Sequence, residues 1–246
     1  MQPREFLASI GTADTPHGSR VDATGKPAGS FFDHLTGAED QLREWGCTEA
    51  VCMAGLFHSV YGTEGFQGFT LPLSDRPKVR EVIGERAERI AFYNCVMDRH
   101  SLDTLARAAA AAGASAAGPL RLRVRPNSPA GKSGRQHYEL SERDFLELMM
   151  VVLADHLEGF QNQMMKPGVN EIAHDVGGQA GYWRIPQNGW FGYRQDAFEA
   201  MATCLGGIYL ESWRAALATV PAGAVPAQWL PRDASYIPKK GTSSKL

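Results

Sequence analysis

The sequence predicts an all-α fold, a helical bundle with an aromatic-rich C-terminal extension. Apolar residues recur at intervals of three and four along several segments, which is the pattern of amphipathic helices. The segment 145–163 has an almost wholly apolar centre, so we expect a long helix that is buried on most sides. Hydrophobic residues make up 43% of the 246 residues, which is enough for a sizeable core.

Composition divides the chain into four parts. Residues 1–29 are rich in Gly, Thr, Asp and Pro, and we expect an irregular lead-in there. The helical core is expected at residues 30–165, and a helical and aromatic cap at residues 166–220. Residues 221–246 are Pro-rich and end in a Lys/Ser/Thr segment, which is typical of a flexible tail.

Two helices are expected to open the core. The first is predicted at residues 30–45, where apolar residues recur at helical spacing, and Gly46 ends it. Thr48 is a good N-cap for the second helix, which we expect to run to the break at Tyr61-Gly62.

The middle of the chain mixes helices with a short strand. A third helix is expected after Asp75-Arg76-Pro77, with apolar positions from Val79 to Ala91. Ser101 is expected to cap a fourth helix. Leucine and valine alternate with arginine at residues 120–125, which indicates an edge strand, and the polar residues 126–136 indicate an exposed loop.

Two further helices complete the prediction. The buried helix at 145–163 is preceded by Ser141-Glu142-Arg143-Asp144, which has the form of a capping box with Asp in place of Glu. The last helix is expected at about residues 195–219, with an interruption at Gly206-Gly207.

Charge and composition exclude several classes of function. The net charge of −2 gives no field that would attract nucleic acid. No run of eighteen apolar residues indicates a membrane span, and the N-terminus lacks the layout of a signal peptide. The four cysteines have no CxxC spacing, so we expect free thiols in a cytoplasmic protein. We expect a small-molecule substrate, and the sequence is compatible with a homodimer.

Three polar residues lie among apolar neighbours on predicted helices. They are His34, His58 and Asp155. A buried charge is costly unless it is paired or binds a metal, and two imidazoles with one carboxylate suit divalent metals. Alternatively, these histidines are satisfied core residues, or one of them is a general base that Asp155 orients without a metal.

The segment Leu153-Ala154-Asp155-His156-Leu157-Glu158 resembles the last metal-binding helix of HD-domain proteins. The order of His34, His58 and Asp155 is also that of HD-domain proteins, and the intervals suit variants that include small di-iron oxygenases as well as phosphohydrolases. A narrower resemblance, over about residues 7–160, is to an uncharacterised bacterial, fungal and plant family with the signature AGLFHSVYGT, which stands here at residues 54–63.

The resemblance implies an HD-like bundle in which His34, His58 and Asp155 bind the metal, with His17 as a fourth ligand. Ser59 departs from the HD pattern, in which an Asp at this position binds metal. A serine hydroxyl is a much weaker ligand, and between residues 59 and 155 only His100 and His137 are available for a second ion. We therefore expect one metal rather than two.

Residues near the predicted metal extend the candidate site. Tyr61 and Glu64 follow the His58 segment directly and are candidate catalytic residues, with Glu64 as a general base. Four aromatic and basic residues further along are candidates to cover the pocket, with a packed cap as the alternative. They are Trp183, Arg184, Trp190 and Arg194.

The resulting hypothesis is a metal-dependent, HD-like enzyme that acts on a small polar or anionic metabolite. We expect one divalent ion, Fe(II) first and Mn or Zn as alternatives, and a mononuclear iron oxygenase as the activity. A hydrolase of the same fold is the runner-up. The substitution at Ser59 supports a third hypothesis, a non-catalytic domain that binds a small ligand or a protein partner.

Overall fold

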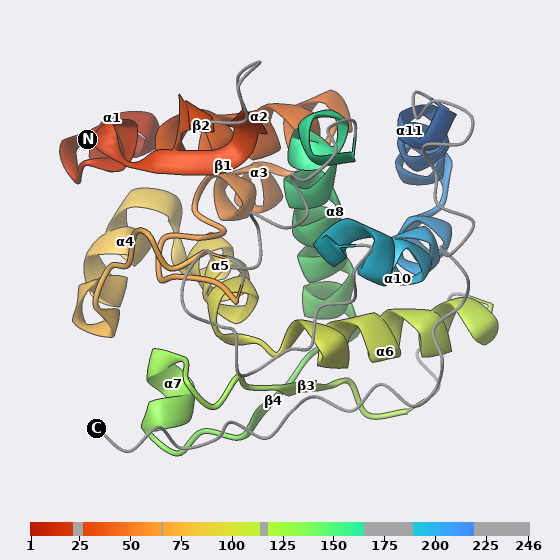
Figure 1. The fold of residues 1–246 in the computed structure, drawn as a ribbon. Helices are drawn as coiled ribbons and strands as arrows, with labels where there is room; N and C mark the ends of the chain where they lie inside the picture. The colour runs from red at the N-terminus through yellow and green to blue at the C-terminus, as the bar shows by residue number, and fades with distance from the viewer. Residues whose placement is uncertain (22–26, 65, 114–117, 165–188, 219–246) are drawn as a thin grey trace.

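The computed structural model describes residues 1–21, 27–64, 66–113, 118–164 and 189–218. Within these ranges the chain is mostly helical, with two small two-stranded sheets, so the predicted all-α class is confirmed (Figure 1). The α-helices are α1 (Pro3–Ser9), α2 (Phe31–Glu44), α3 (Glu49–Leu56), α4 (Arg76–Ile83), α5 (Glu85–Val96), α6 (Arg99–Ala111), α7 (Pro129–Lys132), α8 (Glu142–Met164), α10 (Gly189–Leu205) and α11 (Gly207–Ala218). The 3₁₀ helices are η1 (Thr12–Asp14) and η2 (Leu73–Asp75), and the strands are β1 (Pro16–Val21), β2 (Pro27–Ser30), β3 (Arg121–Arg123) and β4 (His137–Glu139).

Helix α8 lies at the centre of the fold. It packs against α2, α3 and α5 on one side and against α10 and α11 on the other (Figure 1). Most of its apolar residues between Leu148 and Ala154 have no exposed surface. The predicted long, buried helix is therefore confirmed, and its contacts on several sides explain why this segment is apolar nearly all round.

Helix α2 matches the prediction for residues 30–45, and its start is fixed by a capping box. The Asp33 N–H donates to the Ser30 hydroxyl at 3.1 Å, and the Asp33 carboxylate accepts from the Ser30 N–H at 2.8 Å. Gly46, with φ of +69°, follows the end of the helix. This helix carries His34, and its N-terminal cap sets where that side chain meets α8.

The expectation of an irregular segment at residues 1–29 was wrong. This part of the chain forms α1, η1 and an antiparallel hairpin of β1 and β2. Pro3 stands in the first turn of α1, and the Glu5 carboxylate accepts from the Gln2 N–H. Leu7 is fully buried in the core, so apolar packing and the cap both stabilise α1.

Helix α3 ends earlier than predicted, at Leu56 rather than at Tyr61-Gly62. A continuing helix would direct the Ser59 N–H to the carbonyl of Gly55. Instead that carbonyl accepts from the backbone N–H of His58 at 3.3 Å and lies 2.6 Å from its ring Nδ1. His58 therefore lies in a tight turn just beyond the helix.

The third and fourth predicted helices also differ in their boundaries. The third is divided into α4 and α5 at Gly84, which has φ of +84°, a conformation that breaks a helix. The fourth, α6, is capped by Asp98 rather than Ser101, because the Asp98 carboxylate accepts from the His100 N–H. This earlier start makes Arg99 the first residue of α6.

The predicted strand near residues 120–125 is confirmed as β3, which pairs with β4. The expected exposed loop at residues 126–136 contains the short helix α7 instead. Ser128 and Ala130 are buried there, and the Ser128 hydroxyl caps α7 by accepting from the Gly131 N–H.

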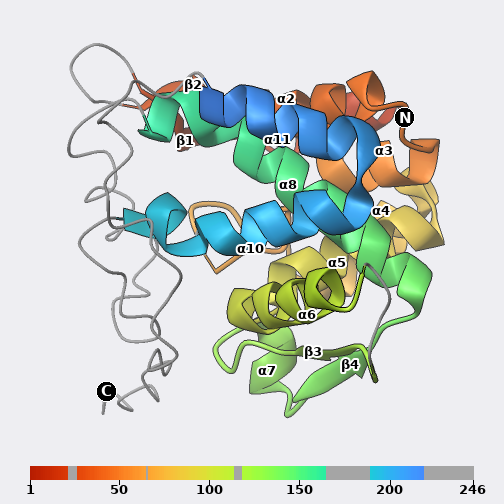
Figure 2. The same cartoon turned by 90° about the vertical axis from the view of Figure 1, so that its right-hand side faces the viewer.

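Two C-terminal helices cover α8 and α6. Figure 2 shows α10 between α11 and α6, and the predicted interruption near Gly206-Gly207 is the break between α10 and α11. Two bidentate ion pairs join α10 to α6, one between Arg194 and Asp103 and one between Arg107 and Asp196. The predicted tail at 221–246 and most of the aromatic stretch lie outside the described residues.

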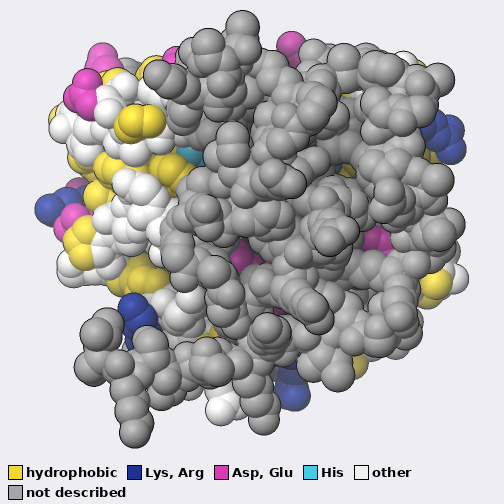
Figure 3. Space-filling view, in the orientation of Figure 1, with side chains coloured by type: hydrophobic (Ala, Val, Ile, Leu, Met, Phe, Trp, Pro, Cys, Tyr) yellow, Lys and Arg dark blue, Asp and Glu magenta, His cyan; other side chains and the backbone are white. Residues whose placement is uncertain are grey.

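The lengths of the helices and the side chains on the surface concern possible contacts with a membrane and with other molecules. Among the described residues, no helix combines the length and apolar character needed to cross a membrane. On the described part of the face in Figure 3, hydrophobic, acidic and basic side chains are interspersed, with one small area of histidine surface beside hydrophobic groups.

Gly55 allows α3 to lie close to α2, and its replacement tests this packing. An alanine Cβ at this position would overlap the fully buried Leu42 side chain. We expect Gly55→Ala to lower the free energy of unfolding by about 1–3 kcal/mol, as measured by urea denaturation.

A matched control is Gly118→Ala, because no atom lies within 4 Å of the Cβ position there. Its free energy of unfolding should change by about 0.5 kcal/mol or less. Equal stability of the Gly55→Ala and Gly118→Ala proteins would contradict close packing at Gly55.

Candidate metal site

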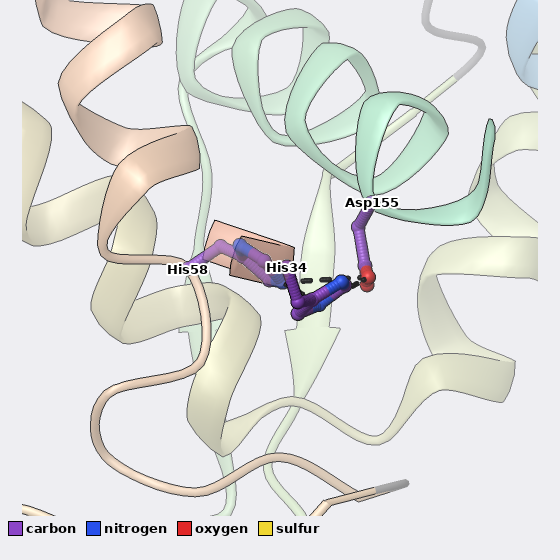
Figure 4. A group of neighbouring side chains, drawn as sticks. All are labelled: His34, His58 and Asp155. Atoms are coloured by element: carbon purple, nitrogen blue, oxygen red, sulfur yellow. Dashed lines mark hydrogen bonds and ion pairs between the residues drawn. The ribbon is translucent and has the colours of Figure 1, made fainter. Parts of the chain in front are cut away.

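Three side chains from separate parts of the fold converge on one point (Figure 4). His34 comes from α2, His58 from the turn after α3, and Asp155 from α8. The Nε2 atoms of the two histidines are 3.0 Å apart, and each lies 3.3 Å from the Asp155 Oδ1 atom. The structure thus brings together the three residues predicted as metal ligands.

The other ring nitrogen of His34 contacts a carboxylate. Its Nδ1 atom is 2.6 Å from the Glu158 Oε2 atom. Because a carboxylate only accepts, Nδ1 carries the hydrogen and donates it. Gly37 makes room for this contact, since a Cβ there would lie 2.7 Å from the Glu158 Cγ atom. The hydrogen bond fixes the His34 ring with Nε2 directed at Asp155.

His58 is oriented in the same way by a backbone group. Its Nδ1 atom donates to the carbonyl of Gly55 at 2.6 Å. The backbone carbonyl of His58 accepts from the Asn94 side-chain amide at 2.8 Å. Both contacts are buried, and they leave Nε2 as the ring nitrogen that faces Asp155.

The spacing of the three atoms fits one divalent metal ion. Ligand atoms about 2.1 Å from a metal are separated by about 3.0 Å at a right angle and about 3.4 Å at the tetrahedral angle. The separations of 3.0 and 3.3 Å lie within this range. Each histidine also has an acceptor on its other nitrogen, which is the usual arrangement of histidines that bind metals.

In the metal-free protein, charges and hydrogen bonds hold His34, His58 and Asp155 together. Burial works against a charge on His34, but hydrogen bonds to Asp155 and Glu158 and their charges outweigh it and raise the pKa of His34 to about 9. Burial would raise the pKa of Asp155, but the charge of His58 and the hydrogen bonds from both histidines hold that pKa well below its ordinary value. Metal binding at His34 therefore releases a proton.

The ring face of His17, the predicted fourth ligand, packs against the group at His34. Its ring stacks on that of His34, with the centroids 4.1 Å apart and 14° between the planes. A ring nitrogen binds metal in the plane of its own ring, so this stacking does not direct His17 at the point where the other three meet. Burial and the neighbouring His34 hold the pKa of His17 well below its ordinary value.

Tyr61, a predicted catalytic residue, belongs to a different cluster. Its hydroxyl donates to the buried Glu88 carboxylate at 3.1 Å, and Arg76 and Arg80 donate to the same carboxylate. Burial and the charge of Glu88 raise the pKa of Tyr61. The contacts place Tyr61 in a network that joins α4 to α5.

Glu64, the other predicted catalytic residue, connects to the site through Arg99. Its Oε2 atom accepts from the Arg99 backbone N–H at 2.9 Å, and the Arg99 guanidinium lies 3.5 Å from the Asp155 Oδ2 atom. Burial and the charge of Asp98 raise the pKa of Glu64 to about 8. At neutral pH Glu64 is therefore mainly a neutral acid that holds a proton, rather than the general base we expected.

The residues expected to cover the pocket are only partly described. Trp183 and Arg184 lie outside the described residues, as does the side chain of Trp190. Arg194 is fully buried, pairs with Asp103 and lies over the Phe198 ring. Its contacts join α10 to α6, which is the packing role given above as the alternative.

The residues considered for a second metal are not members of this group. Ser59 is buried, and its backbone carbonyl accepts from the Gly62 N–H. His100 is in the first turn of α6, and His137 lies half-exposed on β4. Among the described His, Cys, Asp and Glu residues, only His34, His58 and Asp155 form a group with metal-like spacing.

The sequence analysis missed two residues of the site. Glu158 lies three residues after Asp155, so both carboxylates project from one face of α8, and that spacing is a signal that could have identified it. Arg99 could not be found in this way, because its position depends on where α6 begins and on the path of the chain after His58.

Comparison with known proteins adds one finding. Residues 17–99 match the model of a domain of unknown function, DUF6817. The matched segment contains His17, His34 and His58 and ends at Arg99, so Asp155 lies beyond it. Neither the search of curated proteins nor that of solved structures found a match.

The pKa of His34 in the metal-free protein tests the contact with Glu158. Glu158→Gln removes one of the two charges that raise this pKa, so the pKa should fall from about 9 by about one unit or more. NMR titration of the imidazole ring measures it, with the half-exposed His137 as an internal control. An unchanged His34 pKa would contradict the contact.

The pH dependence of stability tests the buried state of Glu64. Its pKa is about 8 in the folded protein against 4.5 ordinarily, so the folded state binds this proton more tightly. The contribution of this bound proton to the free energy of unfolding is complete below pH 4.5 and is lost as the pH rises to 8. Glu64→Gln should remove this dependence, which amounts to on the order of 1 kcal/mol per pH unit.

Urea denaturation of both proteins between pH 4.5 and 8 measures the difference. The stability of Glu64→Gln relative to wild type should increase with pH over this window. Parallel stability curves would show that Glu64 ionises as an exposed carboxyl does.

Proposed function

We propose that His34, His58 and Asp155 bind one divalent metal ion and that the protein is a metal-dependent enzyme. The observation that supports this most strongly is the convergence of two imidazole nitrogens and one carboxylate oxygen at separations of 3.0 and 3.3 Å. A set of three such ligands leaves further positions on the metal for a substrate or water.

We infer an HD-like fold for the helices that carry these ligands. The support is the order of the ligands along the chain, with a histidine on α2, a second just after α3 and an aspartate on the distant helix α8. The resemblance of residues 153–158 to the last metal-binding helix of HD-domain proteins agrees with this order. The position of Ser59 argues for one ion, because a hydroxyl is a weak ligand.

We infer that iron is the resident metal and that the reaction is the oxidation of a small metabolite. When bound, iron in a set of two histidines and one carboxylate supplies oxidation chemistry, whereas zinc or manganese supplies hydrolytic chemistry. The chain itself orients the ligands through Glu158 and Gly55. These two contacts hold both rings in place before any metal arrives.

The burial of the ligands limits the size of the substrate and its direction of approach. His58 has no exposed surface and His34 has 4%, whereas 16% of the Asp155 side chain is exposed. The Asp155 side is therefore the more open one, and Arg99 lies there. A small polar or anionic substrate fits such an approach.

A hydrolase built on the same three ligands is the second candidate function. The neutral Glu64 carboxyl, connected to Asp155 through Arg99, favours it because a protonated carboxyl can act as the acid that protonates a leaving group. A resident zinc ion would exclude the oxidation, which requires a redox-active metal, and would leave the hydrolase.

Metal analysis of the protein purified without chelator tests the proposed site. We expect close to one iron per chain by mass spectrometry of the digested protein. Replacing His58 or Asp155 by Ala should reduce the metal content by a factor of about ten or more, because each removes one of three ligands.

Two variants serve as controls. His137→Ala removes a half-exposed histidine on β4, and Asp98→Asn keeps the cap of α6 while it removes a buried carboxylate charge outside the group. Both should keep the wild-type metal content. A folded wild-type protein that contains no metal and takes up none from Fe(II), Mn(II) or Zn(II) would disprove the proposal.

A further inference from the structure

A buried arginine, Arg99, lies beside Asp155, the most exposed of the three candidate metal ligands. Arg99 is 5% exposed, and its Nη2 atom lies 3.5 Å from the Asp155 Oδ2 atom. The other oxygen of Asp155, Oδ1, faces the two histidines. Asp155 is thus shared between the group that would hold the metal and the guanidinium of Arg99.

The neighbouring carboxylates are engaged with other arginines. Asp103, one turn along α6, forms a fully buried bidentate pair with Arg194. Asp98, which precedes Arg99, pairs with Arg123 at 2.6 Å and caps α6. Asp155 is the carboxylate that lies within ion-pair distance of the Arg99 guanidinium.

Glu64 adds a second polar group next to Arg99. It is 2% exposed, and its Oε2 atom accepts from the Arg99 N–H. No described residue hydrogen-bonds to its Oε1 atom. A buried polar atom of this kind normally has a partner, so a ligand or water is expected at Oε1. Because burial keeps the carboxyl mainly protonated at neutral pH, Glu64 can donate a hydrogen bond there.

We propose that Arg99 and Glu64 bind an anionic group of the substrate, a carboxylate or a phosphate, beside Asp155. This inference rests on the proposed function, since it assigns the substrate class of the same site. A guanidinium matches both anions with two parallel hydrogen bonds, and a protonated carboxyl adds a third donor. The anion would lie next to the point where His34, His58 and Asp155 meet, which places the rest of a small substrate at the metal.

Anion binding to the full chain tests this subsite. Inorganic phosphate and acetate are the two probes, and isothermal titration calorimetry measures their affinities for the metal-free and the Zn(II)-loaded protein. We expect wild type to bind at least one anion, and Arg99→Met to bind it about 10- to 100-fold more weakly with its metal content unchanged. Arg121→Met is the control, because Arg121 is exposed on β3 and pairs with Glu139, and its affinity should equal that of wild type.

Two substitutions of Glu64 separate its role from that of Arg99. Glu64→Gln keeps a hydrogen-bond donor and should retain the affinity within about threefold, whereas Glu64→Leu should weaken it about tenfold. If Arg99→Met does not fold, Arg99→Lys keeps the charge but loses the paired geometry, and it should still weaken binding severalfold.

The outcomes also distinguish the two proposals. A protein that takes up no metal but binds phosphate or acetate through Arg99 would disprove the metal site and keep the anion subsite. A metal-loaded Arg99→Met or Arg99→Lys protein with wild-type affinity for the anion would overturn the subsite, and so would a wild-type protein that binds neither anion.

Discussion

The site depends on one imidazole held between two carboxylates of the same helix. His34 contacts Glu158 through Nδ1 and Asp155 through Nε2, and both carboxylates follow the apolar stretch of α8 at residues 148–154. Two like charges in such a place would be costly alone. The protonated ring between them offsets this cost and joins α2 to α8, so the same contacts serve packing and the candidate chemistry.

Close contacts between helices determine how the two rings are oriented. Gly37 brings α2 near Glu158, and Gly55 brings α3 near Leu42 while its carbonyl holds the ring of His58. A larger side chain at either glycine would separate the parts that carry the ligands from the groups that orient them. The geometry of the site is therefore a property of backbone packing as much as of the ligand residues.

Much of the fold and the core of the site could be predicted from the sequence. The apolar periodicity located α2 and α8, and polar residues among apolar ones identified His34, His58 and Asp155. Features that depend on tertiary contacts could not be predicted. The early end of α3 follows from one side-chain contact to a carbonyl, and the hydroxyl of Tyr61 meets Glu88 only because α4 and α5 pack together there.

The ligands come from two distant stretches of the chain, with both histidines inside the segment matched by the family model and Asp155 beyond it. An unfolded chain therefore has no preformed site, and metal that binds only the folded state adds its binding free energy to the free energy of unfolding. For the same reason, a fragment limited to residues 17–99 would retain His34 and His58 without Asp155, the carboxylate that completes the group. Occupancy by metal would then report whether α8 has docked against α2.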